Sequence, residues 1–208
     1  MPHKLYYCLM INGKAPRYLE AGNARQQLAF EVLQVLRLWA RLADFDPVLA
    51  GTIPLAIDTP ESDLDVLCEV VLAEQPHFCQ LLKSYYGHLP DFRLRRAVVG
   101  DEDSIISNFR YEGFEIEVFD QAIPTSQQLG FRHLLIDHVL LQAGREAWRR
   151  AVQQLKERVP KTEPAFALLL QLSGNPYETL LTLEGKPPAE LRAYLSQVPL
   201  PKADNTTN

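Results

Sequence analysis

The feature that most restricts the possible folds of this chain is a change of pattern near residue 125. Before that point, short segments of alternating apolar and polar residues, typical of half-buried strands, stand among helical segments. After it, apolar residues recur only at the three- and four-residue steps of amphipathic helices. We therefore expect an α+β fold, in which a mixed β-sheet core with flanking helices precedes a helical C-terminal subdomain.

The same change of pattern suggests an organisation in four parts. We expect the α/β core over residues 18–124 and the helical subdomain over residues 125–198. An N-terminal extension over residues 1–17 and a flexible tail over residues 199–208 complete the chain. A chain of 208 residues is long enough to bury such a core without disulfide bonds or structural metals.

Individual elements can be assigned from periodicity and from the glycine and proline residues between them. A helix over residues 22–44 precedes a short strand at 48–50, a longer strand at 62–72 and a helix over 74–87. Three strands follow at 92–99, 104–111 and 114–119, and their short connections indicate antiparallel pairing. The later helices are expected at residues 126–143, 145–159, 163–172, 177–183 and 188–196.

Composition argues against several classes of protein. A net charge of −5 is unusual for a protein that binds nucleic acid over its whole surface. Three cysteines without a CxxC pair argue against a disulfide framework and a cysteine zinc site, and they favour a reducing compartment. No apolar run reaches the ~20 residues of a membrane span, and the apolar N-terminal stretch is not followed by a signal-peptide cleavage region. We therefore expect a cytoplasmic protein.

Two aspartates in the strand at 62–72 are the clearest chemical signal in the chain. Asp63 and Asp65 flank Leu64, so the alternation of a strand points both carboxylates to one face. Two negative charges so close together repel each other unless a cation lies between them. Mg²⁺, or Mn²⁺ in its place, prefers such oxygen ligands, and Mg²⁺ commonly binds one or two carboxylates together with substrate phosphates.

Two further segments add to this candidate site. Gly51 and Thr52 end the preceding strand, where a glycine permits close backbone approach and a hydroxyl can donate to a phosphate. Glu115 and Glu117 share one face of the strand at 114–119. Either glutamate can supply a third carboxylate if the two strands are neighbours, and we prefer Glu117. Carboxylates, a divalent metal and a glycine-hydroxyl turn are suited to in-line nucleotidyl transfer.

The stretch from Leu49 to Thr52, the spacer and the segment Ser62 to Val66 resemble the catalytic motif of the polymerase-beta-like nucleotidyltransferase superfamily. In that motif a glycine and a serine precede two acidic residues that flank a hydrophobic residue. Over roughly residues 18–185, the chain more closely resembles a small family of uncharacterised bacterial proteins, a domain of unknown function placed in that superfamily. The segments that carry this closer resemblance are residues 22–27, 51–69, 114–119 and 132–133.

The resemblance implies a metal-dependent nucleotidyltransferase that moves a nucleoside monophosphate from a nucleoside triphosphate to an acceptor hydroxyl and releases pyrophosphate. Asp63, Asp65 and Glu117 would hold the metal, and Glu115 is the alternative third carboxylate. The acceptor is open between a small molecule, a protein side chain and an RNA end, and the acidic composition argues against a long nucleic acid. The expected nucleotide-binding residues are Gly51, Thr52, Ser62, Arg132 and His133.

Departures from the superfamily pattern support alternatives to an active transferase. Thr52 stands where serine is usual, and Leu55-Ala56 stands where an arginine–glycine pair is common. Without that arginine, the chain can be a catalytically inactive module that binds a nucleotide or a protein partner, and a toxin-like transferase is a third possibility. Instead of binding a metal, Glu115 and Glu117 can lie on an exposed edge strand, where their charges face water.

Overall fold

The structure is a computed structural model and describes residues 16–201. The expected N-terminal extension and flexible tail, together with Cys8, therefore lie wholly or mostly outside the described residues. The described chain forms two compact units. The first contains the described residues up to Ala56 and the segment Glu61–Phe131, and the second contains Ile57–Pro60 and the described residues from Arg132 on.

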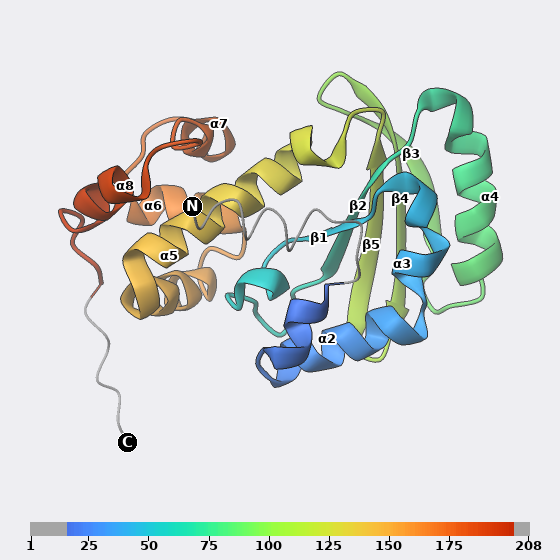
Figure 1. The fold of residues 1–208 in the computed structure, drawn as a ribbon, viewed down its shortest axis with the longest axis horizontal. Helices are drawn as coiled ribbons and strands as arrows, with labels where there is room; N and C mark the ends of the chain where they lie inside the picture. The colour runs from blue at the N-terminus through green and yellow to red at the C-terminus, as the bar shows by residue number, and fades with distance from the viewer. Residues whose placement is uncertain (1–15, 202–208) are drawn as a thin grey trace. The chain divides into compact units, whose positions relative to one another are not determined.

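A five-stranded mixed sheet forms the centre of the first unit (Figure 1). The strand order is β1-β2-β5-β4-β3; β2 and β5 are parallel, and the other three neighbouring pairs are antiparallel. The five expected strands and the antiparallel pairing of the last three are confirmed. Their bounds are β1 Val48–Ala50, β2 Leu64–Glu69, β3 Arg93–Val99, β4 Glu102–Tyr111 and β5 Phe114–Gln121.

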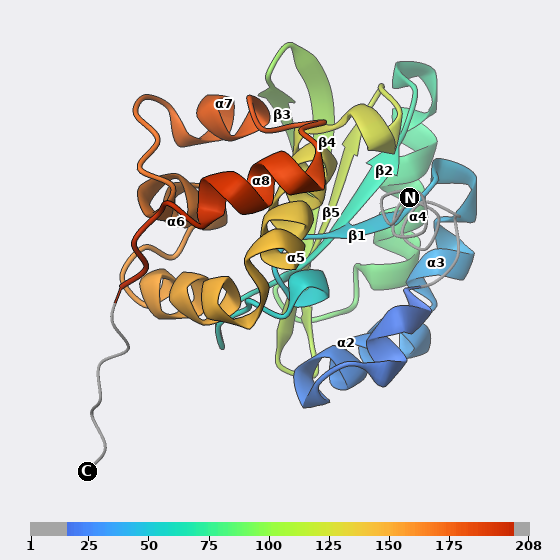
Figure 2. The same ribbon diagram turned by 60° about the vertical axis from the view of Figure 1, so that its left-hand side comes forward.

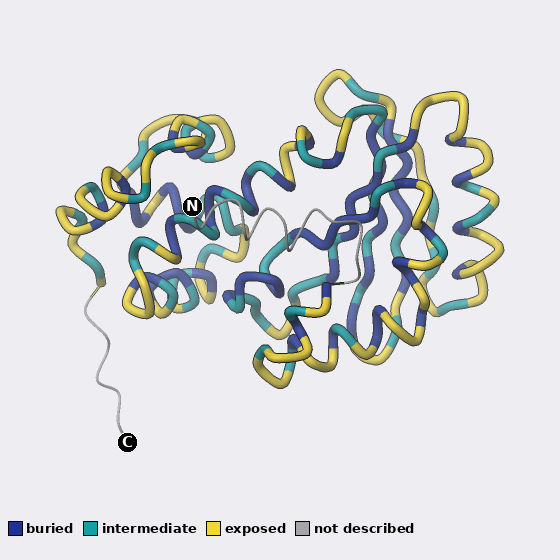
Figure 3. The backbone as a smooth tube through the Cα atoms, in the orientation of Figure 1, coloured by how far each residue is buried: buried dark blue, intermediate teal, exposed yellow. Residues whose placement is uncertain are grey.

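Three helices cover one face of this sheet: α2 (Ala24–Val35), α3 (Leu38–Arg41) and α4 (Gln75–Tyr86). Their buried side chains pack on apolar side chains that alternate along the strands, as expected for a sheet with one covered face. These sheet residues are Leu49, Leu64, Val66, Cys68, Ile105, Phe109, Phe114, Ile116 and Val118. In Figure 3 strands β1, β2 and β5 are largely buried, whereas the outer turns of α4 are exposed, and β3 at the edge of the sheet is mostly exposed as well.

The prediction of a single long helix over residues 22–44 is wrong. α2 ends at Val35, Arg37 adopts a left-handed conformation with φ 52° and ψ 34°, and a short α3 begins at Leu38. Val35 is 63% exposed, because the face that packs on the sheet contains Ala29, Val32, Leu33 and Leu36. The apolar periodicity continues through the break, so the pattern alone hides it.

The second unit contains the greater part of α5 (Leu129–Lys156) together with α6 (Thr162–Leu169), α7 (Pro176–Leu181) and α8 (Pro188–Leu195) (Figure 2). Arg145 interrupts α5 with φ 56° and ψ −154°, so the break expected between two helices at this point is confirmed. The preceding Gly144 packs on Trp148, since a β-carbon at Gly144 would lie 2.2 Å from the Trp148 Cγ.

Short 3-10 helices connect several of these elements, at Arg17–Ala21, Ala43–Phe45, Ile53–Leu55, Leu72–Glu74 and Thr125–Gln127. Within residues 16–201, no helix combines the length and the apolar character needed to cross a membrane. The fold class expected from the sequence, a mixed-sheet α+β core followed by helices, is confirmed.

Candidate functional site

The register of the parallel strands β2 and β5 brings together two of the expected site residues. Asp65 is the direct partner of Glu117 in this register. Residues opposite each other on neighbouring strands point to the same face, and the strands lie about 4.8 Å apart. Both side chains are half-buried, and both lie on the face opposite to α2, α3 and α4. The sheet therefore places two carboxylates side by side.

Gly51 lies directly against the Asp65 carboxylate. It follows the last residue of β1 and has φ 78°, in the left-handed region that favours glycine. A β-carbon at Gly51 would lie 2.3 Å from Asp65 Oδ2 and 3.3 Å from its Cγ. The close approach that the sequence predicted at this glycine is therefore made by the aspartate itself, and any side chain here would displace the carboxylate.

The hydroxyls of Thr52 and Ser62 connect the two ends of the loop between β1 and β2. Thr52 Oγ1 donates a hydrogen bond to Ser62 Oγ over 3.0 Å. Because Thr52 follows Gly51 and Ser62 precedes Asp63, this bond closes the loop beside the aspartates. The two expected phosphate-binding hydroxyls are thus brought together.

Asp63 lies one residue before β2, because the strand is shorter at both ends than the sequence suggested. It is half-buried. Two residues of chain span at most about 7 Å, so the backbone keeps Asp63 close to Asp65 even without strand pairing.

The two glutamates of β5 have different surroundings. Glu115 accepts from Arg93 Nη2 over 3.2 Å and from Arg110 Nη2 over 3.1 Å. Glu117 accepts from the neutral amide of Asn108, Nδ2 to Oε2, over 3.0 Å, and the same amide donates over a longer 3.4 Å to Glu115 Oε1. Asn108 is the direct partner of Glu117 on β4. The charge of Glu115 is therefore balanced by two arginines, whereas the partner of Glu117 carries no charge.

Within residues 16–201, no group of three or more His, Cys, Asp and Glu side chains is spaced to hold a metal ion. The pair formed by Asp65 and Glu117 nevertheless fits a hard divalent cation, since Mg²⁺ typically takes one or two carboxylates and completes its shell with water and phosphate oxygens. Two adjacent half-buried carboxylates also repel each other, and a divalent cation relieves that repulsion.

The first turn of α2 contributes contacts that the sequence reasoning missed. Gln26 Nε2 donates to the Ile53 carbonyl over 2.8 Å, just after the Gly51-Thr52 turn. Asn23 caps the helix, and the Gln26 side chain bonds back to the Asn23 backbone in a capping box. The Asn-x-x-Gln spacing was the available signal, because it places Gln26 in the first turn of the helix.

Arg25 contacts the other end of the same loop. Its Nη2 donates to the Ser62 carbonyl over 3.1 Å. Its guanidinium also lies 4.8 Å from the centre of the Phe114 ring, at the start of β5. Nothing in the spacing of the sequence connects Arg25 with Ser62, which is 37 residues away.

Arg132 and His133 make their observed contacts within the second unit. Arg132 pairs with Glu184, Nη2 to Oε2 over 2.6 Å, and this bond raises the pKa of Arg132 and lowers the pKa of Glu184. His133 is buried, and its Nε2 lies 2.9 Å from the Tyr177 carbonyl. Their contact with a nucleotide stays a prediction.

A buried polar cluster lies deeper in the second unit. Lys156 is 3% exposed and donates to the Pro160 carbonyl over 3.0 Å and to Thr162 Oγ1 over 2.9 Å. Burial lowers the pKa of Lys156 and raises the pKa of Asp137 well above its ordinary value. Within residues 16–201, Asp137 Oδ1 has no hydrogen-bond partner.

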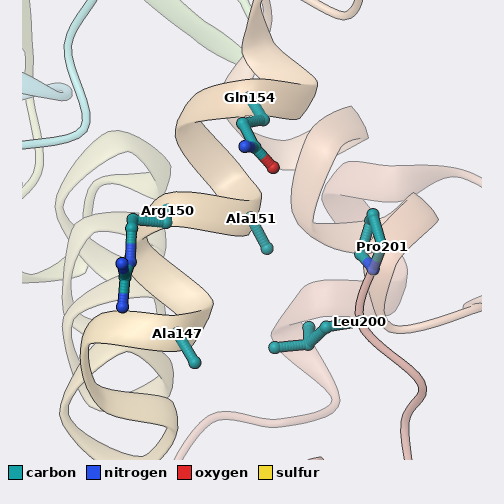
Figure 4. A pocket seen from close by; sticks show the side chains of 6 residues that line it. All are labelled: Ala147, Arg150, Ala151, Gln154, Leu200 and Pro201. Atoms are coloured by element: carbon teal, nitrogen blue, oxygen red, sulfur yellow. The ribbon is translucent and has the colours of Figure 1, made fainter. Parts of the chain in front are cut away.

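A pocket of about 250 Å³ lies between α5 and the end of the described chain (Figure 4). The side chains of Ala147 and Ala151 point toward Leu200 and Pro201, whereas Arg150 extends to the other side. No carboxylate lines this pocket. It therefore lacks the acidic ligands of the candidate metal site.

Comparison with known proteins identifies a family. A family model described as a domain of unknown function, DUF4269, matches residues 31–183. No curated protein matches the chain in sequence.

Several solved structures resemble the fold at low sequence identity. A structure of Cid1 that concerns its RNA terminal uridylyl transferase activity is 12% identical, with a TM-score of 0.48 over 81% of this chain and 51% of that chain. The Cid1 poly(U) polymerase bound to MgATP is 13% identical, with a TM-score of 0.47 over 86% and 52%. The GLD-2/RNP-8 complex is 10% identical, with a TM-score of 0.42 over 94% and 82%. The chain spans about half the length of the Cid1 chains.

Proposed function

The chain belongs to the family of the domain of unknown function DUF4269, and on this premise we propose that it is a metal-dependent nucleotidyltransferase of the polymerase-beta-like type. The reaction transfers a nucleoside monophosphate from a nucleoside triphosphate to an acceptor hydroxyl. The observation that carries the proposal is the β2–β5 register, which sets Asp65 opposite Glu117 and beside Gly51.

The proposed ligands of Mg²⁺, or of Mn²⁺, are the carboxylates of Asp63, Asp65 and Glu117. Because the three are not spaced as a ready metal site in the described structure, this set requires the Asp63 side chain to turn toward the other two when the ion binds. The short chain between Asp63 and Asp65 and the register between Asp65 and Glu117 support this set. When bound, the ion would neutralise triphosphate oxygens and stabilise the leaving pyrophosphate. Glu115 is the weaker candidate, because two arginines already balance its charge.

The loop between β1 and β2 is the proposed phosphate side of the site. The Thr52 and Ser62 hydroxyls lie 3.0 Å apart, and either can donate to a phosphate oxygen after a rotation about its C–O bond. The left-handed backbone at Gly51 is typical of turns whose N–H groups bind anions.

Glu117 is the proposed acceptor of the proton from the attacking hydroxyl. The oxygen freed of that proton bonds to the α-phosphorus, the bond between that phosphorus and the bridging oxygen breaks, and pyrophosphate leaves. Asn108 holds the Glu117 carboxylate by a hydrogen bond. The acceptor class is open between a small molecule, a protein side chain and an RNA end.

A catalytically inactive binding module on the same fold is the second candidate. The specific observation in its favour is that residues 51–65 contain no lysine or arginine, and that Leu55-Ala56 stands where the superfamily pattern has an arginine. Such a module would bind a nucleotide without turnover.

The test is pyrophosphate release from each of the four ribonucleoside triphosphates with Mg²⁺, in the presence of short RNA, mixed proteins or small hydroxyl compounds. We expect Asp65→Asn to lower the rate by about 100-fold or more, because it removes a charged group at the reacting phosphates. Glu69→Gln is the matched control, on the same face of β2 but opposite Gln121. Nucleotide binding by the wild type without turnover would favour the inactive module, and equal rates for Asp65→Asn and the wild type would contradict the proposal.

A further inference from the structure

We propose that the acceptor is a small phosphorylated hydroxyl compound, and that Arg93 and Arg95 of β3 bind its phosphate. The inference rests on the proposed function and deepens it, because it names the chemical class of the acceptor. Three observations carry it: the strand order of the sheet, the face on which the two arginines lie, and the acidic residues around them.

The in-line geometry of nucleotidyl transfer fixes the side from which the acceptor approaches. The attacking and leaving oxygens lie on opposite sides of the α-phosphorus. The loop between β1 and β2 is the proposed phosphate side, and these two strands lie at one end of the strand order β1-β2-β5-β4-β3. With pyrophosphate on that side, the attacking hydroxyl comes from the side of β4 and β3.

One row of residues leads across the sheet from the candidate metal site to Arg93. Glu117 is the direct partner of Asn108 on β4, and Asn108 is the direct partner of Arg93 on β3. Partners in register point to the same face, so Arg93 shares the face of Asp65 and Glu117, opposite to α2, α3 and α4. The ion pair of Arg93 Nη2 with Glu115 Oε1, over 3.2 Å, agrees with this placement.

Arg95 extends this cationic surface along β3. It lies two residues after Arg93 and therefore on the same face, whereas Leu94 between them packs against the covered core. Arg95 is exposed, and within residues 16–201 its side chain makes no hydrogen bond or ion pair. Arg93 donates to Glu115 through Nη2, and a guanidinium carries five N–H donors. Such groups match the geometry of phosphate oxygens, so the two arginines suit a phosphate ligand.

Acidic residues on both sides of the two arginines favour a small ligand. Asp91 pairs with Arg110 over 3.2 Å, just before β3 begins. At the other end of β3, residues 101–103 of the turn and of β4 are all acidic. A long nucleic acid would bring further phosphates toward these carboxylates, which repel them. The backbones of β5 and β3 lie two strand spacings apart, about 10 Å, so one small molecule can present a hydroxyl to Glu117 and a phosphate to β3.

The phosphate of the acceptor takes no part in the bond changes. The acceptor hydroxyl gives its proton to Glu117, and its oxygen bonds to the α-phosphorus of the nucleotide. The bond from that phosphorus to the bridging oxygen breaks, and pyrophosphate leaves. The acceptor phosphate only holds the molecule in place.

The test measures acceptor binding by calorimetry, with the full chain in the presence of Mg²⁺ and an α,β-methylene nucleoside triphosphate. The probes are glycerol 3-phosphate and ribose 5-phosphate, each compared with its unphosphorylated parent, and a short 5′-phosphorylated RNA. We expect the wild type to bind the two phosphorylated compounds about tenfold more tightly than their parents, because charge-assisted hydrogen bonds to the phosphate are added. The RNA should bind more weakly than the two small phosphates.

Arg95→Gln is the cleanest variant, because it breaks no ion pair within residues 16–201 and should not disturb the fold. Arg95→Gln and Arg93→Gln should each weaken the binding of the phosphorylated compounds by about tenfold and leave the binding of their parents unchanged. In turnover they should raise the KM of the acceptor, while the acidic limb of the rate profile keeps its position because Glu117 is untouched.

Arg96→Gln is the matched control. Arg96 follows Arg95 on the same exposed strand, but it is the direct partner of the core residue Ile105 and therefore points to the opposite face. Arg96→Gln should bind every probe as the wild type does.

Three results would overturn the inference. The wild type binds phosphorylated and parent compounds equally, the Arg93 and Arg95 variants bind like the wild type, as arginines that only protect a sheet edge would, or the RNA binds more tightly than the small phosphates. A wild type that does not bind the nucleotide analogue with Mg²⁺ overturns the proposed function as well. Binding of the analogue without any preference for phosphorylated acceptors leaves the proposed function intact.

Discussion

The Asp65 carboxylate occupies the space that a side chain on residue 51 would need: a β-carbon on Gly51 would lie 2.3 Å from Asp65 Oδ2. The turn that follows β1 and Asp65 of β2 are therefore one structural unit. Since Asp65 also stands opposite Glu117, the glycine, the aspartate and the glutamate depend on one another for their positions.

Gly51→Ala should lose nucleotide binding together with stability. The substitution forces a β-carbon into a left-handed backbone and into the Asp65 carboxylate, at an expected cost of about 1–3 kcal/mol in unfolding free energy. Urea unfolding and a nucleotide titration measure the two effects. Gly100→Ala is the control, because Gly100 has φ 65° and nothing within 4 Å of its added β-carbon. It should lose stability but keep binding, and loss of binding in both variants would contradict the role of the Asp65 contact.

Asn108→Asp should shift the pH profile of the reaction. The change replaces a neutral amide, which donates to Glu117 and over a longer distance to Glu115, with a second carboxylate, and a neighbouring like charge raises a carboxyl pKa. The acidic limb of the rate profile should move to higher pH by about one unit, while the KM of the nucleotide changes little. Arg93→Gln, which removes a partner of Glu115 only, is the control. An unchanged limb in Asn108→Asp would argue against Glu117 as the general base.

Asp120 should make stability depend on pH in mildly acidic solution. This carboxylate is fully buried on the covered face of the sheet, where it accepts from the Ile105 backbone N–H and from Gln75 Nε2. Burial raises its pKa from 3.8 to about 6. A carboxyl with a raised pKa in the folded state binds its proton more tightly there, so its contribution to the unfolding free energy grows as the pH falls through about 6 and is complete below 3.8.

Urea unfolding of the wild type and of Asp120→Asn between about pH 7 and pH 4.5 measures this contribution. The unfolding free energy of the wild type minus that of Asp120→Asn should increase by about 2 kcal/mol as the pH falls across this range. Asp101→Asn, at an exposed position of the β3–β4 turn, is the control and should differ from the wild type by a constant amount. A constant difference for Asp120→Asn would show that this carboxyl does not titrate in that range.

In the second unit, Lys156→Met should destabilise the fold more than Asp137→Asn. Removing the Lys156 ammonium leaves the Pro160 carbonyl and the Thr162 hydroxyl without their buried donor, which costs about 1–3 kcal/mol. Asp137→Asn instead removes a carboxyl whose charged form burial already disfavours, so its stability at neutral pH should equal or exceed that of the wild type. Thermal unfolding of the two variants measures both effects, and the reverse order of stability would contradict this account.

Local pattern predicted most of the fold, because alternation and turn residues act over a few neighbours. Glu112 and Gly113, for example, both have positive φ, as a two-residue hairpin turn requires. The break at Arg37 could not be predicted, because the apolar residues keep their helical spacing from α2 into α3. Which face of these helices packs on the sheet is decided by tertiary packing. The spacing of the aspartates predicted a shared face, but only the sheet register distinguishes Glu117 from Glu115 as the partner of Asp65. The contact of Arg25 with Ser62 depends on long-range packing and left no local signal.

The most direct test of the central claim is electron paramagnetic resonance of Mn²⁺ titrated into the protein with an α,β-methylene nucleoside triphosphate. The Mn²⁺ that the analogue binds without protein is measured separately and subtracted. After this correction, the wild type and Glu115→Gln should bind Mn²⁺, whereas Asp65→Asn and Glu117→Gln should bind it far more weakly. Equal Mn²⁺ binding by the wild type, Asp65→Asn and Glu117→Gln would contradict the claim that these two carboxylates hold the metal together.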